Sequence, residues 1–96
     1  MFTEGNGTEQ SSFKLSEHAR KRSQQRAIPE SVIDLLLDFG DEAYLGGGVT
    51  SFSFRKKSWR TAARYLGAKT KYFERYRSCY AVVAEDGTII TVAYCH

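Results

Sequence analysis

Three residues with side chains able to do chemistry recur at every fourth position early in the chain: His18, Arg22 and Arg26. On a helix this spacing places them one above another along a single face, so one imidazole lies beside two guanidinium groups. Arginine binds phosphate through paired N–H donors, and imidazole titrates near neutral pH. The spacing indicates a phosphate-binding face with one proton carrier. The alternative is a solvated basic face on which the histidine only caps or packs.

Cleavage of RNA without a metal ion would use such a set. It requires a base for the 2′-hydroxyl proton, an acid for the leaving 5′-oxygen, and cations beside the transition state. We expect His18 to act as the acid or base, and Arg22 and Arg26 to hold the scissile phosphate. Tyr94 is a candidate second proton carrier, with packing as its alternative role. His96 is another, but as the last residue it is expected to fray.

The basic residues are confined to two segments. Residues 14–26 hold five of the 14 Lys and Arg and residues 55–77 hold the other nine, while residues 30–42 hold five acids and no base. We expect the basic segments to form one surface that faces away from the acidic segment and binds a polyanion. Contacts of this kind add affinity and salt dependence rather than sequence choice. The candidate phosphate-binding residues are Lys14, Arg20, Lys21, Lys56, Arg60 and Arg64.

Length and composition indicate one small domain. The 96 residues carry a formal charge of +3, and 42% of them are hydrophobic, which suffices for a single core. We expect a disordered tail at residues 1–12 and a domain at 13–96. The sequence contains no apolar run of membrane-spanning length and no recognisable signal peptide, so we expect a cytoplasmic protein without membrane contact. Two cysteines in that compartment favour free thiols.

Helix signals flank the chemical residues. Ser16 is a good N-cap for a helix over Glu17 to Arg26 that ends before Pro29. A second helix from Pro29 to Gly40 has an apolar face and, at i, i+4 and i+8, three acids that we interpret as a solvated face rather than a metal site. The two helices are expected to form an αα-hairpin. The three acids are Glu30, Asp34 and Asp38.

The middle of the chain predicts a strand over Val49 to Phe54, after a flexible turn of three glycines, and then a helix over Lys56 to Leu66. This helix carries a basic stripe, for which a solvated amphipathic surface is the alternative. Its Trp59 is expected in the core rather than as a surface for base stacking. The next stretch, Ala68 to Arg77, fits either a helical turn or the start of a strand.

A β-hairpin is predicted over Ser78 to Tyr94, because Asp86-Gly87 is a pair favoured in two-residue type I′ turns. That turn places Glu85 opposite Thr88, Val83 opposite Ile90, Ala81 opposite Val92 and Cys79 opposite Tyr94. Cys95 then lies on the other face from Cys79. A disulfide between the cysteines is therefore not expected. Both faces of the hairpin are largely apolar, as in central strands, so a sheet of at least three strands is expected.

Three motifs resemble a family of small bacterial proteins grouped with BrnT-like and RelE/ParE-like toxins. They are SxHAxxRxxxRxI at Ser16 to Ile28, the following acidic and apolar helix that ends in glycine, and DGTIITVAY at Asp86 to Tyr94. The resemblance implies an α+β fold in which an N-terminal helical hairpin packs on a small antiparallel sheet, here with a further basic helix. His18, Arg22 and Arg26 occupy motif positions of the family.

The resemblance also implies a function. BrnT-like and RelE-like members cleave RNA without a metal ion or other cofactor, usually as the toxin of a toxin-antitoxin pair, so the expected partners are RNA or ribosome-bound mRNA and an antitoxin. The alternative is a non-catalytic interaction protein, such as a mobile-element or phage-encoded inhibitor, whose basic face binds an acidic protein or a nucleic-acid site. A third alternative is a ParE-like inhibitor of a nucleic-acid enzyme, which would damage DNA metabolism rather than RNA.

Overall fold

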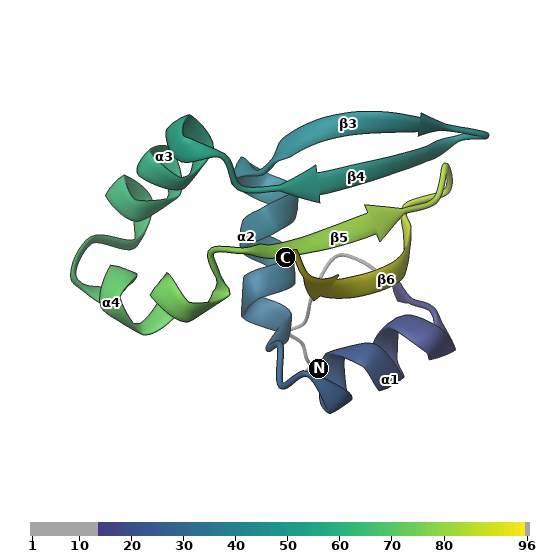
Figure 1. Cartoon of the computed structure of the whole chain (residues 1–96), viewed down its shortest axis with the longest axis horizontal. Coiled ribbons are helices and arrows are strands. Elements are labelled where there is room, and N and C mark those ends of the chain that lie inside the picture. Colours follow the sequence, from purple (N-terminus) through teal and green to yellow (C-terminus); the bar gives the residue numbers. More distant parts are fainter. Residues whose placement is uncertain (1–13, 96) are drawn as a thin grey trace, which may run out of the picture.

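The computed structural model describes residues 14–95 and shows an α+β fold, as the sequence predicts. Three helices of nine to eleven residues and one short helix accompany a five-stranded sheet (Figure 1). In chain order the elements are β2 (Lys14–Leu15), α1 (Glu17–Gln25), α2 (Glu30–Phe39), β3 (Asp41–Gly46), β4 (Val49–Ser53), α3 (Lys56–Leu66), η1 (Gly67–Lys69), α4 (Thr70–Phe73), η2 (Glu74–Tyr76), β5 (Cys79–Val83) and β6 (Thr88–Tyr94). The predicted tail at residues 1–12 and His96 lie outside the described residues.

The sheet has the strand order β2-β6-β5-β4-β3. Its neighbours pair antiparallel except β2, which runs parallel to β6 at one edge. Strands β5 and β6 are both interior, which confirms the prediction from their apolar faces. In Figure 1, α2 passes behind the strands, α1 lies below β6, and α3 with α4 projects at one end of the sheet.

The two N-terminal helices pack mainly against different parts of the sheet and not against each other, so the expected αα-hairpin is wrong. Helix α1 packs mainly against β6, whereas α2 packs against β4, β5 and α3. The main core unites buried residues of both helices with residues of β5 and β6: Ala19, Ile28, Val32, Ile33, Leu36, Cys79, Ala81, Ile89 and Val92. A smaller cluster of Leu35, Trp59 and Ala62 attaches α3 to α2. Trp59 is only 5% exposed, which confirms its predicted place in the core.

Ser16 joins α1 to the sheet. Its Oγ accepts a hydrogen bond from the Ala19 backbone N–H (3.0 Å), as predicted for an N-cap, and donates one to the Ile90 carbonyl oxygen (3.1 Å). Its own N–H donates to the Ile89 carbonyl oxygen (3.0 Å). One residue thereby fixes both the start of α1 and its position along β6.

The predicted turn of the C-terminal hairpin is wrong by one residue. Ala84, not Glu85, pairs with Thr88 through its N–H (2.8 Å), and the loop contains three residues that end in Gly87 at φ 91°. This is the geometry of a type I turn followed by a left-handed glycine. A bulge between Val82 and Val83 then offsets the extra loop residue.

The bulge restores most of the predicted register. Val83 pairs with Ile89 instead of Ile90, but Ala81 still pairs with Val92 and Cys79 with Tyr94. Because a slip of one residue would turn the apolar set to the wrong face, burial of these side chains favours the compensating bulge. Both cysteines are free, and Cys79 is buried while Cys95 is exposed.

Strand β3 was not predicted from the sequence. It pairs with β4 beyond the turn at Gly46, Gly47 and Gly48, all of which have positive φ. The Tyr44 hydroxyl accepts a hydrogen bond from the Gly48 N–H (2.9 Å), so the turn has a defined closure. Residues 68–77, for which the sequence left two alternatives, form the helical segments η1, α4 and η2.

Candidate functional site

Helix α1 carries the three predicted chemical residues in one row beside its buried face. His18 and Arg26 are exposed and Arg22 is half-buried, while Ala19 is fully buried against the core. Arg26 caps the helix and its N–H still bonds to the Arg22 carbonyl oxygen (3.0 Å), so the four-residue spacing from His18 to Arg26 is helical throughout. The structure thus keeps these three side chains on one side of α1.

The end of α1 is held by a Schellman motif. The Ile28 N–H bonds to the Ser23 carbonyl oxygen (2.9 Å), and the Ala27 N–H bonds to the Gln24 carbonyl oxygen (3.2 Å). Ala27 occupies the left-handed position at φ 54°, where glycine is usual, and Ile28 is buried next to it. Burial of Ile28 therefore fixes the direction in which the chain leaves Arg26.

Other basic residues surround α1. Arg20 and Lys21 are exposed on the helix, and Lys14 is exposed on the adjoining strand β2. Lys14 lies near Asp86 in the hairpin turn. The pKa of Asp86 is lowered mainly by a hydrogen bond from the Thr88 N–H (2.9 Å), and Lys14 adds a smaller electrostatic effect. Lys14 therefore lies between the basic residues of α1 and the acidic hairpin turn at Asp86.

Tyr94 does not join this group. Its side chain packs against the main core and its hydroxyl is hydrogen-bonded to Cys79. Burial raises the pKa of Tyr94, and the charged or polar groups that also affect it are Cys79, Tyr76 and Arg75. None of these lies on α1. The predicted second proton carrier is therefore engaged elsewhere in the fold.

The basic residues of α3 form a separate surface. Lys56, Arg60 and Arg64 are all exposed, and Figure 1 shows α3 at the opposite end of the molecule from α1, with α2 and the sheet between them. The expectation of one continuous basic surface facing away from the acidic segment is wrong. Helix α2 packs against α3 through Leu35 and Trp59, which brings the acidic segment into contact with the basic one.

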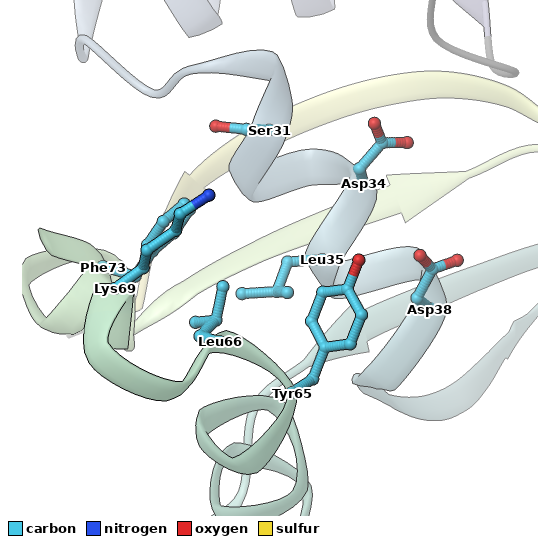
Figure 2. Close-up of a pocket in the computed structure, with 8 residues that line it drawn as sticks. All are labelled: Ser31, Asp34, Leu35, Asp38, Tyr65, Leu66, Lys69 and Phe73. Carbon is cyan, nitrogen blue, oxygen red and sulfur yellow. The ribbon is translucent and has the colours of Figure 1, made fainter. Parts of the chain in front are cut away.

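A groove of about 620 Å³ lies where α2 meets α3, η1 and α4. Its polar lining residues are Ser31, Asp34, Asp38, Tyr65 and Lys69, above apolar side chains of Leu35, Leu66 and Phe73. Figure 2 shows the two carboxylates projecting from α2, with Tyr65 rising from α3 and its hydroxyl directed toward α2. The sequence signal for this groove is the acid spacing on α2, which by itself predicts a solvated face.

Asp34 is not fully solvated as expected, because its side chain is half-buried at the groove. Its pKa is raised, first by burial and then by the negative charges of Asp38 and Glu30 on the same helix face. Among residues 14–95, no three His, Cys, Asp or Glu side chains come close enough together to hold a metal ion. The groove presents carboxylates to solvent beside one lysine ammonium.

Comparison with family models, with curated proteins and with solved structures gives no match to this chain. No helix in the part of the chain that the structure describes is long and apolar enough to cross a membrane.

Proposed function

We propose that the protein binds RNA through the His18, Arg22 and Arg26 row of α1 and cleaves it there without a metal ion, as a toxin acting in the cytoplasm. The observation that supports this is the row of His18, Arg22 and Arg26 along one side of α1, where His18 and Arg26 are exposed and Arg22 is half-buried. The RNA would be free or ribosome-bound mRNA, and an acidic antitoxin would be the natural partner for so basic a helix. No cofactor is required by this chemistry.

In this proposal two arginines bind the phosphate and one histidine transfers the proton. Arg22 and Arg26 hold the oxygens of the scissile phosphate, where guanidinium N–H donors stabilise the charge of the transition state. His18 takes the proton from the 2′-hydroxyl, whose oxygen then attacks the phosphorus. The bond from phosphorus to the 5′-oxygen breaks, and water protonates that oxygen. The products are a 2′,3′-cyclic phosphate and a 5′-hydroxyl.

The test is cleavage of a single-stranded RNA by the purified protein in EDTA. We expect His18→Ala to reduce the rate by about a hundredfold or more, the usual contribution of a positioned acid or base. Arg22→Ala should also reduce it strongly, whereas Gln24→Ala, at an exposed position of α1 outside the His18, Arg22 and Arg26 row, is the matched control and should leave the rate unchanged. Wild-type protein that leaves RNA intact, or a His18→Ala variant as active as wild type, overturns the proposed cleavage.

A second candidate is a non-catalytic inhibitor that binds an acidic protein or blocks a nucleic-acid site. The position of Tyr94 favours it, because its hydroxyl is hydrogen-bonded to Cys79 and His18 is the one predicted proton carrier that lies on α1. An inhibitor should lose affinity in steps as Arg22, Arg26, Arg60 and Arg64 are neutralised, and His18→Ala should leave it unchanged. Damage to DNA with intact RNA on expression in bacteria would indicate a ParE-like target.

A further inference from the structure

The segment at residues 55–77, which we call the α3–α4 arm, combines charge and exposed aromatic rings. It connects β4 to β5 and contains nine of the chain's 14 Lys and Arg, all nine of them exposed. Glu74 is its one acid. Figure 1 shows the arm projecting from one end of the sheet, away from α1. This density of exposed cations fits a polyanion rather than a neutral partner.

Two tyrosines of the arm are exposed although large aromatic side chains usually contribute to cores. Tyr65 is 72% and Tyr72 is 66% exposed. The arm does not lack places to bury a ring, because Trp59 and Phe73 pack against α2 in the smaller core cluster. The arm thus attaches to the fold through one set of aromatic residues and presents another set to solvent.

Cations lie beside two tyrosine rings of the arm, those of Tyr72 and Tyr76. The Lys71 Nζ is 5.3 Å from the centre of the Tyr72 ring, and the Arg75 guanidinium carbon is 5.5 Å from the centre of the Tyr76 ring. Tyr65 instead packs against the Phe39 ring of α2, with centroids 5.1 Å apart, which supports its ring from one side. An exposed ring beside a cation, as at Tyr72, can contact a flat base while the cation contacts its phosphate.

We propose that the α3–α4 arm binds single-stranded RNA, with Tyr65 and Tyr72 stacking on bases and the surrounding cations contacting phosphates. This inference rests on the proposed function, since RNA is the substrate proposed for α1. The two tyrosines favour a single strand because a duplex hides the faces of its bases, which exposed rings need for stacking. An acidic protein would satisfy the cations but offers no comparable array of flat faces.

The test measures binding of labelled oligouridylate and oligothymidylate, which are unstructured single strands, and of an RNA duplex. Tyr72→Ala and Tyr65→Ala should each weaken binding of both single strands by about fivefold or more, the usual effect of removing one stacked base contact. Tyr72→Phe keeps the ring and should bind like wild type. The matched control is Tyr44→Ala, because Tyr44 is 70% exposed but lies on β3, outside the arm.

Salt dependence separates stacking from charge. Tyr72→Ala should lower affinity without changing the slope of log affinity against log salt, whereas Arg64→Ala should reduce the slope by about 0.7, the value of one phosphate contact on a single strand. The proposal is overturned if the tyrosine variants bind like wild type, if the duplex binds as tightly as the single strands, or if polyglutamate binds more tightly than oligouridylate.

The oligothymidylate probe distinguishes failure of this inference from failure of the proposed function, because DNA lacks the 2′-hydroxyl that cleavage requires. Binding of both single strands that depends on Tyr72, without RNA cleavage, supports the arm and overturns cleavage at α1. His18-dependent cleavage with unaltered binding by Tyr65→Ala and Tyr72→Ala overturns the role of the arm and leaves the proposed function standing.

Discussion

Tyr94 and Cys79 pair across β5 and β6, and the Tyr94 hydroxyl is hydrogen-bonded to the Cys79 sulfur. Burial raises the pKa of the Cys79 thiol to about 11, although the bond from Tyr94 acts in the opposite direction. Burial also raises the pKa of Tyr94. Both groups therefore stay protonated near neutral pH, in a core contact rather than in the basic surface of α1.

Alkaline pH should destabilise the fold through Cys79. Its pKa is raised from 9.0 to about 11, so the unfolded chain releases the thiol proton at lower pH than the folded chain. This contribution to stability is complete below pH 9 and is lost as pH rises to about 11, by about 2 kcal/mol. Urea unfolding at several pH values, with reductant present, measures it.

Cys79→Ala is the control for this prediction, because tyrosines and lysines titrate in the same range. The variant should be less stable at pH 8 but should lose less stability than wild type between pH 9 and pH 11. Parallel losses in the two proteins would contradict the prediction.

Tyr94→Phe should leave the rate of the proposed RNA cleavage within about twofold of wild type. The Tyr94 hydroxyl is hydrogen-bonded to Cys79, and none of the groups that shift its pKa lies on α1. A positioned proton carrier contributes about a hundredfold or more, so the measurement distinguishes the two roles. Cleavage rates of His18→Ala provide the comparison. A loss as large as that of His18→Ala would restore Tyr94 to the catalytic residues.

Ala27→Gly should stabilise the protein. Ala27 holds φ 54° in the motif that ends α1, and an L-residue with a Cβ is strained there while glycine is not. We expect a gain of about 0.5 to 1 kcal/mol in the free energy of unfolding, reduced by the greater flexibility of glycine in the unfolded chain. Ala19→Gly, at a buried helical position, should destabilise instead. A loss of stability in Ala27→Gly would show that the strain is not relieved.

Neutralising two aspartates should have opposite effects. The pKa of Asp34 is raised by burial and by Asp38 and Glu30, so its charge disfavours the folded state and Asp34→Asn should raise the melting temperature at pH 7. The pKa of Asp86 is lowered by the Thr88 N–H, so Asp86→Ala should reduce the melting temperature. The raised pKa of Asp34 means that the folded protein binds this proton more tightly than the unfolded chain. The resulting contribution to stability is therefore present at acid pH and is lost as pH rises from 3.8 through the folded pKa. Thermal unfolding at pH 3 and pH 7 tests both signs.

Local signals predicted the helices well. Ser16 begins α1, Gly40 follows α2, and Gly67 follows α3, because capping and glycine geometry act within a few residues of the chain. Strand β3 lacked such a signal. Its Glu42 and Tyr44 pair with Phe52 and Thr50 of β4 but remain exposed at the sheet edge, so the sequence shows no apolar alternation there.

The spacing of His18, Arg22 and Arg26 was determined by the sequence alone, since any helix from Ser16 must place them on one side. Three features were decided only by tertiary packing: the separation of the α1 and α3 surfaces, the groove beside Asp34, and the hydrogen bond between Tyr94 and Cys79. They depend on which apolar faces pack together, because burial of Ala19 places α1 against β6 and burial of Trp59 places α3 against α2. Such long-range choices minimise exposed apolar area over the whole chain, which no local spacing encodes.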